Sequence, residues 1–117
     1  MICITVYCRN GAYTGFDAAG HAEYEESGRD IICAAASALI VNTVNSIETL
    51  TDNTVEDEKE EDGFSSCRFP DGLDRDGALL MESLILGLKQ MAEIRDASDN
   101  KPYVTLLFEE VQEDAES

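Results

Sequence analysis

Hydrophobic and polar residues alternate at the start of the chain. The apolar residues that share one face of this segment are Ile2, Ile4, Val6 and Cys8. Such alternation predicts a strand with one buried face. Residues 9–11 (Arg-Asn-Gly) supply the turn of a hairpin, and a second strand is predicted over residues 12–19. That strand would end directly before Gly20 and His21.

A polar segment separates this hairpin from a long apolar one. Residues 23–29 contain a single apolar side chain, Tyr24, and are predicted to form an exposed loop, a candidate for mobility. Residues 31–50 predict a helix that is apolar almost all the way round in its first half and narrows to one stripe in its second. Asp30 stands directly before this helix and suits an N-cap.

The next segments predict a second hairpin. A strand could begin within residues 51–55, and residues 64–69 are interpreted as the return strand. Between them, residues 56–62 form a charge run that ends at Gly63. Like charges repel one another and stay hydrated, so this run is typical of a solvated turn.

A second helix is predicted over residues 76–95, where apolar residues recur every three or four positions. Gly87 in its middle costs about 1 kcal/mol relative to alanine, which indicates close packing against a neighbour such as the first helix. Residues 103–108 are apolar on both faces, as is typical of a strand inside a sheet. The acidic tail from about Glu109 is expected to fray.

Together these elements predict one α+β domain over residues 1–117. The order β-β-α-β-β-α-β gives a single-domain α/β sandwich, in which two long helices pack with mainly antiparallel strands. A chain of 117 residues is long enough for one domain with a modest core but not for two. Its hydrophobic content of 44% is typical of a folded globular protein.

The charge balance restricts the class of partner. Twenty-five acidic residues stand against 8 basic ones, which gives a formal net charge of −17. Phosphate contacts need Lys and Arg, so direct binding of nucleic acid is excluded and anionic membranes are disfavoured. The charge fits a cationic partner or substrate, and it equally fits a protein that its charge merely keeps soluble.

Apolar runs and cysteines bear on location and cofactors. No run reaches the roughly 18 consecutive apolar residues of a membrane span, and residues 1–8 lack the basic region of a secretion signal. The four cysteines, at positions 3, 8, 33 and 67, match no zinc pattern, and one histidine gives poor support for a metal site. We therefore expect a cytoplasmic chain with reduced thiols, no metal and no cofactor.

The cysteine with a chemical context is Cys33, which follows the only histidine, His21, after a loop. If Asp30 caps the helix, Cys33 lies in its first turn, where free N–H groups and the helix dipole favour a thiolate. His21, held at a strand end, could form an ion pair with that thiolate, as a cysteine nucleophile requires. A cysteine in an apolar segment is otherwise usually a small buried hydrophobe, and we expect this role for Cys3, Cys8 and Cys67.

Other residues near this pair could support it. They are Gly20, Asp30, Ala34 and Ser37. The backbone N–H groups of Cys33 and Ala34 could donate to an oxyanion. Asp30 could orient His21, although its ordinary role would be the N-cap. Ser37, one turn beyond Cys33, could contact the site or bond back to a helix carbonyl. The small residues 34–38 allow close backbone approach near Cys33.

The motifs around this pair resemble those of a known family. The first motif is Gly20-His21-Ala22, followed after a short loop by Gly28-x-Asp30-x-x-Cys33-Ala34-Ala35-x-Ser37-Ala38-Leu39. The resemblance continues in Leu86-Gly87-Leu88 with Ala92, and in Tyr103-Val104. On these residues the chain resembles the ribosomal-processing cysteine protease Prp family over nearly its whole length.

The resemblance implies a homodimeric α/β sandwich with two helices between sheets. It also implies a cysteine peptidase without a cofactor, which removes a short N-terminal extension from ribosomal large-subunit protein number twenty-seven after a pair of aromatic residues. Carried onto this chain, Cys33 is the nucleophile, and His21 is the general base and later the general acid.

Two other classes of function remain open. The acidic surface could belong to a non-enzymatic ribosome-assembly factor that holds a basic ribosomal protein by charge alone. A redox role would need a resolving thiol close to Cys33, and the cysteine spacing provides none.

Overall fold

A computed structural model of the chain describes residues 2–20, 27–59, 64–95, 97 and 99–111. Its elements are β1 (Ile2–Arg9), β2 (Ala12–Ala19), α1 (Ser27–Leu50), β3 (Glu56–Lys59), β4 (Phe64–Arg68), α2 (Arg75–Ala92) and β5 (Val104–Glu110). This order confirms the predicted α+β succession of two strands, a helix, two strands, a helix and a strand.

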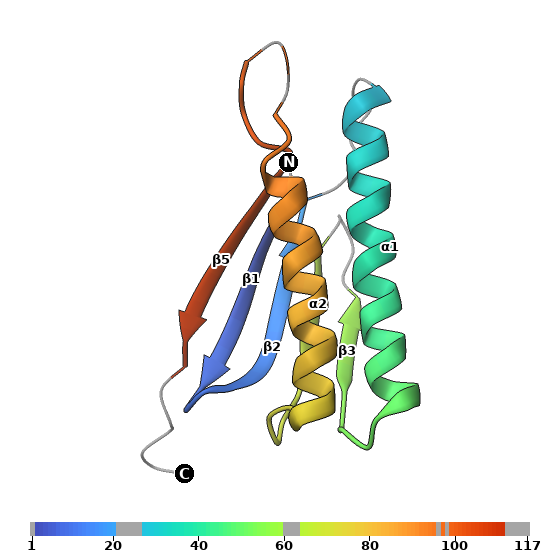
Figure 1. Cartoon of the computed structure of the whole chain (residues 1–117), viewed down its shortest axis with the longest axis vertical. Helices are drawn as coiled ribbons and strands as arrows, with labels where there is room; N and C mark the ends of the chain where they lie inside the picture. The colour runs from blue at the N-terminus through green and yellow to red at the C-terminus, as the bar shows by residue number, and fades with distance from the viewer. Residues whose placement is uncertain (1, 21–26, 60–63, 96, 98, 112–117) are drawn as a thin grey trace.

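The five strands form one mixed sheet in the order β3-β4-β2-β1-β5. Three of the four pairings are antiparallel, whereas β1 and β5 run parallel. Both helices lie side by side on one face of the sheet (Figure 1). Within the described part of this single chain there is one sheet only, so helices enclosed between two sheets would require a second copy.

The core lies between the sheet and the helices. The alternation of β1 places Ile2, Ile4 and Val6 in it, each at most 5% exposed. From the helix layer the buried residues include Ala36, Val44, Ile47, Met81, Leu84 and Leu88. Gly87 packs closely against α1, since a Cβ built on it would lie 2.9 Å from Cδ1 of Leu39. The predicted packing of Gly87 against the first helix is confirmed.

Helix α1 begins earlier than the sequence predicted. It starts at Ser27, so Asp30 lies inside the first helical turn and is not its N-cap. Polar residues suit a solvated first turn as well as a loop. An acidic residue is favoured by the helix dipole throughout the first turn, and not only at the cap. The sequence of residues 27–30 therefore could not distinguish a loop that ends in an N-cap from the first turn of a helix.

The charge run does not form only a turn. Its first four residues, Glu56–Lys59, form β3, which pairs with β4 at one edge of the sheet. Charged side chains are a common feature of edge strands, because they oppose pairing with another chain. The rest of the run, residues 60–63, lies outside the described residues.

The last strand lies at an edge of the sheet and is not internal. It pairs with β1 alone, since β2 occupies the other side of β1. Burial falls along it from Val104, which is fully buried, to Phe108, which is 50% exposed. The strand also includes Glu109 and Glu110, so the acidic tail does not fray from residue 109. Residues 112–117 lie outside the described residues.

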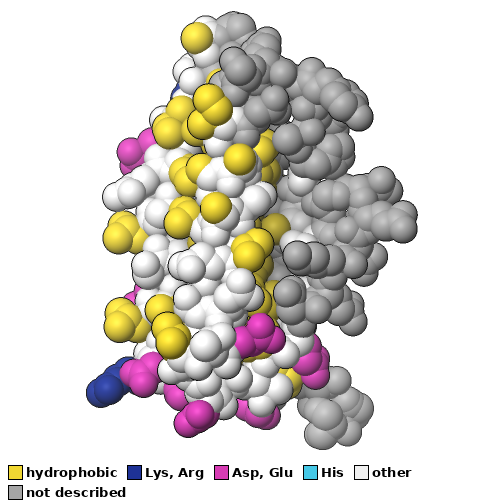
Figure 2. All heavy atoms as spheres, turned by 90° about the vertical axis from the view of Figure 1, so that its right-hand side faces the viewer, with side chains coloured by type: hydrophobic (Ala, Val, Ile, Leu, Met, Phe, Trp, Pro, Cys, Tyr) yellow, Lys and Arg dark blue, Asp and Glu magenta, His cyan; other side chains and the backbone are white. Residues whose placement is uncertain are grey.

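Much of α1 faces solvent in the single chain. Its segment Ile31–Leu50 is long and apolar enough, by length and composition, to cross a membrane, and 28% of the apolar window is buried. The helix packs against the core through one face, as the core helix of a soluble domain does. Its other face carries hydrophobic side chains along much of its length, with acidic groups mostly toward the lower end (Figure 2).

Candidate active site

The end of β2 and the start of α1 lie at the same end of the molecule (Figure 1). Strand β2 ends at Ala19, and Gly20 follows with φ +116°, a conformation that side-chain-bearing residues rarely adopt. Gly20 thus sets the direction in which the chain leaves the sheet. His21 and residues 22–26 lie outside the described residues, so the predicted His21–Cys33 contact and most of the predicted 23–29 loop do as well.

Cys33 belongs to the hydrophobic core of this end of the molecule. Its side chain is 7% exposed and forms part of the cluster that includes Ile2, Ala18 and Ala36. Since α1 starts at Ser27, Cys33 lies in its second turn and not in its first. Helix dipole effects fall off within the first turn, so the start of α1 stabilises a Cys33 thiolate less than the sequence predicted.

The same shift affects the predicted oxyanion donors. Only the first four N–H groups of a helix lack partners within it. The N–H groups of Cys33 and Ala34 lie beyond these four in α1, so the hydrogen-bond ladder of the helix engages them. The prediction that they are free to bind an oxyanion does not fit this helix.

Ala34 and Ser37 lie on the solvent side of α1. Both are exposed, whereas Cys33 and Ala36 are buried. One turn separates Ser37 from Cys33 along the helix, but the two side chains differ in burial, so they do not share one environment. Of the small residues 34–38, which the sequence predicted to allow close backbone approach near Cys33, Ala36 is fully buried.

The other three cysteines differ from Cys33 in position. All four cysteines lie among the described residues, and no disulfide joins any of them; Cys67 is 1% exposed, whereas Cys3 and Cys8 are half-buried. Burial, and after it the nearby Glu110 carboxylate, raises the pKa of the Cys8 thiol. By burial alone Cys33 resembles Cys67. What separates them is that Cys33 lies in the second turn of α1, in a core cluster that includes Ala18 near the end of β2.

A polar cluster that the sequence did not predict lies on the sheet face opposite the helices. Arg68 Nη1 lies 2.8 Å from Asp17 Oδ1, and the Tyr7 hydroxyl donates to Asp17 Oδ2 at 2.8 Å. Burial raises the pKa of Asp17, but hydrogen bonds from Arg68 and Tyr7 outweigh it, and the pKa is lowered. The strand alternation placed Tyr7 and Asp17 on one face, yet only the register of β2 with β4 brings Arg68 beside them.

The described side chains suggest no metal centre. Among them, no three His, Cys, Asp or Glu residues come together as a group that could hold an ion. The chemistry that the described part of this end of the molecule can offer is therefore that of the Cys33 thiol.

Comparisons with known proteins agree on one family. The family model described as cysteine protease Prp matches residues 1–99. The ribosomal processing cysteine protease Prp of Bacillus subtilis is 32% identical over 90 residues, which are 73% of this chain and 79% of that protein. The protein of the same name from Staphylococcus aureus is 31% identical over 75 residues, which are 63% of this chain and 71% of that protein.

Solved structures show the same fold. A crystal structure from Streptococcus mutans superimposes with a TM-score of 0.76 at 31% identity and covers 93% of this chain and 99% of that one. The S. aureus ribosomal processing protease Prp with a covalently linked product peptide gives a TM-score of 0.76 at 26% identity, over 93% and 100% of the two chains. The same protease with a substrate peptide gives 0.78 at 25% identity over the same shares.

Proposed function

The chain belongs to the cysteine protease Prp family, and on that premise we propose that Cys33 and His21 form its catalytic pair. Membership makes the chain a cysteine peptidase. The observation that carries the residue assignment is the geometry of one end of the fold, because the strand that leads into His21 ends at the same end of the molecule at which the helix that bears Cys33 begins (Figure 1).

The mechanism assigns one role to each residue at each step. His21 accepts the Cys33 thiol proton, and the thiolate attacks the scissile carbonyl to form a tetrahedral adduct. Collapse of the adduct breaks the peptide bond, leaves the acyl group on Cys33 and passes the proton from His21 to the leaving amine. Water, deprotonated by His21, then hydrolyses the thioester and restores the thiol. The dipole of α1 adds little at its second turn, so His21 supplies most of the activation of Cys33.

The substrate we propose is the N-terminal extension of ribosomal large-subunit protein number twenty-seven, cut after its aromatic pair in the cytoplasm. The relatives are named ribosomal processing cysteine proteases, which supports a ribosomal substrate. The S. aureus structures with a substrate peptide and a covalently linked product peptide support a peptide in the site. A net charge of −17 fits a basic ribosomal protein, because opposite charge speeds their encounter.

The proposed substrate is tested by incubating the purified chain with a synthetic peptide of that extension and reading the products by mass spectrometry. We expect one cut, after the aromatic pair, and a matched peptide with the two aromatics replaced by serine should stay intact. A non-enzymatic assembly factor would bind the basic protein and leave the peptide whole. That result, with a folded protein, would refute the proposed substrate.

We also propose that two copies pair through the outer face of the helix layer. The large hydrophobic side chains exposed on α1 and α2 include Ile31 (66%), Val41 (46%), Leu79 (67%) and Leu86 (60%). Both helices lie on one face of a single sheet, so their outer face has no cover within the described chain (Figure 1). A second copy would bury these residues and give the homodimeric sandwich with helices between two sheets.

A further inference from the structure

The two edges of the sheet have opposite characters. At one edge, β3 has four residues, all charged: Glu56-Asp-Glu-Lys59. At the other, β5 has seven residues, of which the first five are Val-Thr-Leu-Leu-Phe. Charged, short edge strands resist pairing with another chain, whereas a longer apolar edge invites it. The peptidase site does not account for a long, apolar edge strand at β5.

The backbone of β5 presents free groups at this edge. The Tyr103 carbonyl accepts from Ile2 N–H at 2.9 Å, and Val111 N–H donates to the Cys8 carbonyl at 2.7 Å. Alternate residues of a strand point their backbone groups to the same side, so residues 103, 105, 107, 109 and 111 bond to β1. The N–H and C=O groups of Leu106 and Phe108 point away from the sheet, where no described strand lies.

A groove runs beside these free groups. It has a volume of about 390 Å³ and lies between α2 and β5, lined by Lys89, Ala92, Glu93, Pro102, Val104, Thr105, Leu106 and Phe108. Phe108 pairs in register with Val6, so its side chain lies on the helix side of the sheet. There it is 50% exposed, and Lys89 Nζ lies 5.7 Å from its ring centroid. Alternate side chains of an added strand would meet this apolar floor.

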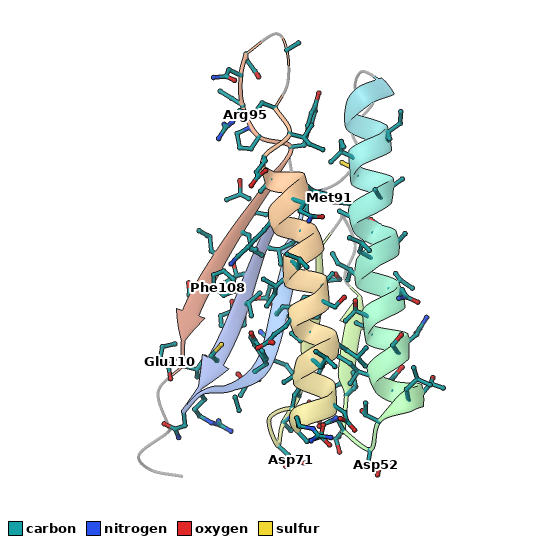
Figure 3. All side chains as sticks on the ribbon, viewed as in Figure 1. Asp52, Asp71, Met91, Arg95, Phe108 and Glu110 are labelled. Carbon is teal, nitrogen blue, oxygen red and sulfur yellow. The ribbon has the colours of Figure 1, made fainter. Side chains whose placement is uncertain are left out.

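The charge of the chain favours a basic partner. Beside the groove itself the charges are balanced: Lys89 and Glu93 line it, and Arg95, which forms an isolated bridge with the groove residue Pro102, is followed by Lys101. Glu109 and Glu110 are exposed at the end of β5, where Figure 3 labels Glu110. Glu109 pairs in register with Tyr7, so its side chain lies on the outer face of the sheet. These carboxylates, within a chain of net charge −17, favour a basic partner.

We propose that the β5 edge is a docking site for an extended, basic segment of a partner protein, which adds to the sheet as a sixth strand. The segment's backbone bonds to Leu106 and Phe108, and its alternate apolar side chains enter the groove. Its lysine or arginine side chains then point to the outer sheet face, where the Glu109 side chain lies. Cys33 does not line the groove, and helix α2 lies between β5 and α1, so this site is separate from Cys33 (Figure 1).

Amide hydrogen exchange, read by NMR on the full chain, tests the proposal. The probe is a short blocked peptide that alternates lysine and valine. In the free chain the amides of Leu107 and Glu109 should exchange slowly and those of Leu106 and Phe108 fast. The peptide should slow exchange at Leu106 and Phe108 and leave Leu107 unchanged. A peptide N-methylated at alternate positions cannot form the ladder and should lose this protection.

Side-chain variants test the groove and the charge. Phe108→Ala should weaken binding of the lysine–valine peptide about tenfold, as loss of an aromatic anchor does. Leu50→Ala, which truncates a side chain 72% exposed at the end of α1, is the matched control and should bind as the wild type does. A peptide that alternates aspartate and valine should bind more weakly than the lysine peptide, because the chain carries a net charge of −17.

Several results would overturn the proposal. Protection of Leu106 and Phe108 in the free monomer would mean that the chain itself covers the edge. Protection that rises with protein concentration, without peptide, would assign the edge to a second copy. Equal binding of the N-methylated or the aspartate peptide would exclude an added basic strand. Full binding by a folded Phe108→Ala variant would exclude the groove.

Discussion

Gly20 is the described residue that directs the chain toward His21. Its φ of +116° is open to glycine and strained for other residues. Gly20→Ala should lower the free energy of unfolding by about 1–3 kcal/mol. It should also misplace His21 and lower kcat/KM about tenfold or more, because small errors in the position of a catalytic group are costly. Urea denaturation and peptide cleavage measure the two effects.

Gly11 provides the matched control for Gly20. It also has positive φ, +83°, and lies in the turn between β1 and β2, at the other end of β2. A Cβ there would meet nothing within 4 Å. Gly11→Ala should therefore reduce stability and leave kcat/KM unchanged. Equal kcat/KM for the two folded variants would contradict the role of Gly20 in directing His21.

Asp17 makes the stability of the fold depend on pH in the acidic range. Its pKa is lowered in the folded chain, so its contribution to stability is present above the unfolded value of about 3.9 and is lost as pH falls through the folded value. Asp17→Asn should lower the free energy of unfolding near neutral pH by about 1 kcal/mol, a modest figure because the Arg68 side chain is 43% exposed.

Urea denaturation near pH 7 and near pH 3 measures this dependence. The difference between wild type and Asp17→Asn should shrink at the lower pH, because the Asp17 carboxyl of the unfolded wild-type chain then binds a proton. Asp71, an exposed loop residue, gives the control Asp71→Asn, which should track the wild type at both values. A constant difference between wild type and Asp17→Asn would contradict the account of Asp17.

The elements show which features of the sequence carry structural information. The alternation of β1 follows directly from its buried face, so Ile2–Arg9 matches the predicted strand closely. The start of α1 does not follow from its residues, because a polar run ending in Asp30 suits both a capped helix start and a solvated first turn. The position of β5 at an edge depends on which strand is beside β1, and β5's own sequence is compatible with either place.

The candidate site and its supporting residues were predicted from different signals. Its chemistry followed from residue types and spacing, since a cysteine near a helix start with one histidine upstream is a specific combination. The supporting residues depended on the exact helix start, and a shift from residue 31 to Ser27 changed the setting of Ala34 and Asp30. The Tyr7–Asp17–Arg68 cluster depends on strand register, which single-sequence patterns do not define.

Packing between α1 and α2 gives a prediction at the scale of elements. A Cβ at Gly87 would lie 2.9 Å from Leu39 Cδ1, the flexible end of a side chain. Gly87→Ala should be nearly neutral, because better helix propensity offsets a small shift of Leu39. Gly87→Leu should lower the free energy of unfolding by about 1–3 kcal/mol through overpacking. Thermal or urea denaturation measures both.

A second substitution identifies the clash behind this effect. In the Leu39→Ala background, Gly87→Leu has room and should cost less than it does in the wild type. The two changes should therefore couple in a double-mutant cycle. Strictly additive effects would show that α1 does not contact α2 at Gly87.

At the scale of the whole molecule, the described residues form one sheet and one helix layer, and no described element covers the apolar outer face of that layer (Figure 1). If a second copy covers this face, Val41→Lys should convert the dimer to a monomer, as measured by sedimentation velocity. Leu107→Lys is the matched control, because Leu107 is 47% exposed, as Val41 is 46% exposed, but lies on the outer sheet face. A wild-type chain that sediments as a monomer would contradict the proposed dimer.

The measurement that tests the central claim most directly is cleavage of the extension peptide by variants with one residue substituted. Cys33→Ala and His21→Ala should fold, as judged by circular dichroism, and lose cleavage by a factor on the order of 1,000 or more. Cys67→Ala, which removes a similarly buried thiol, should keep it. Wild-type rates of cleavage by Cys33→Ala or His21→Ala would contradict the assignment of the catalytic pair.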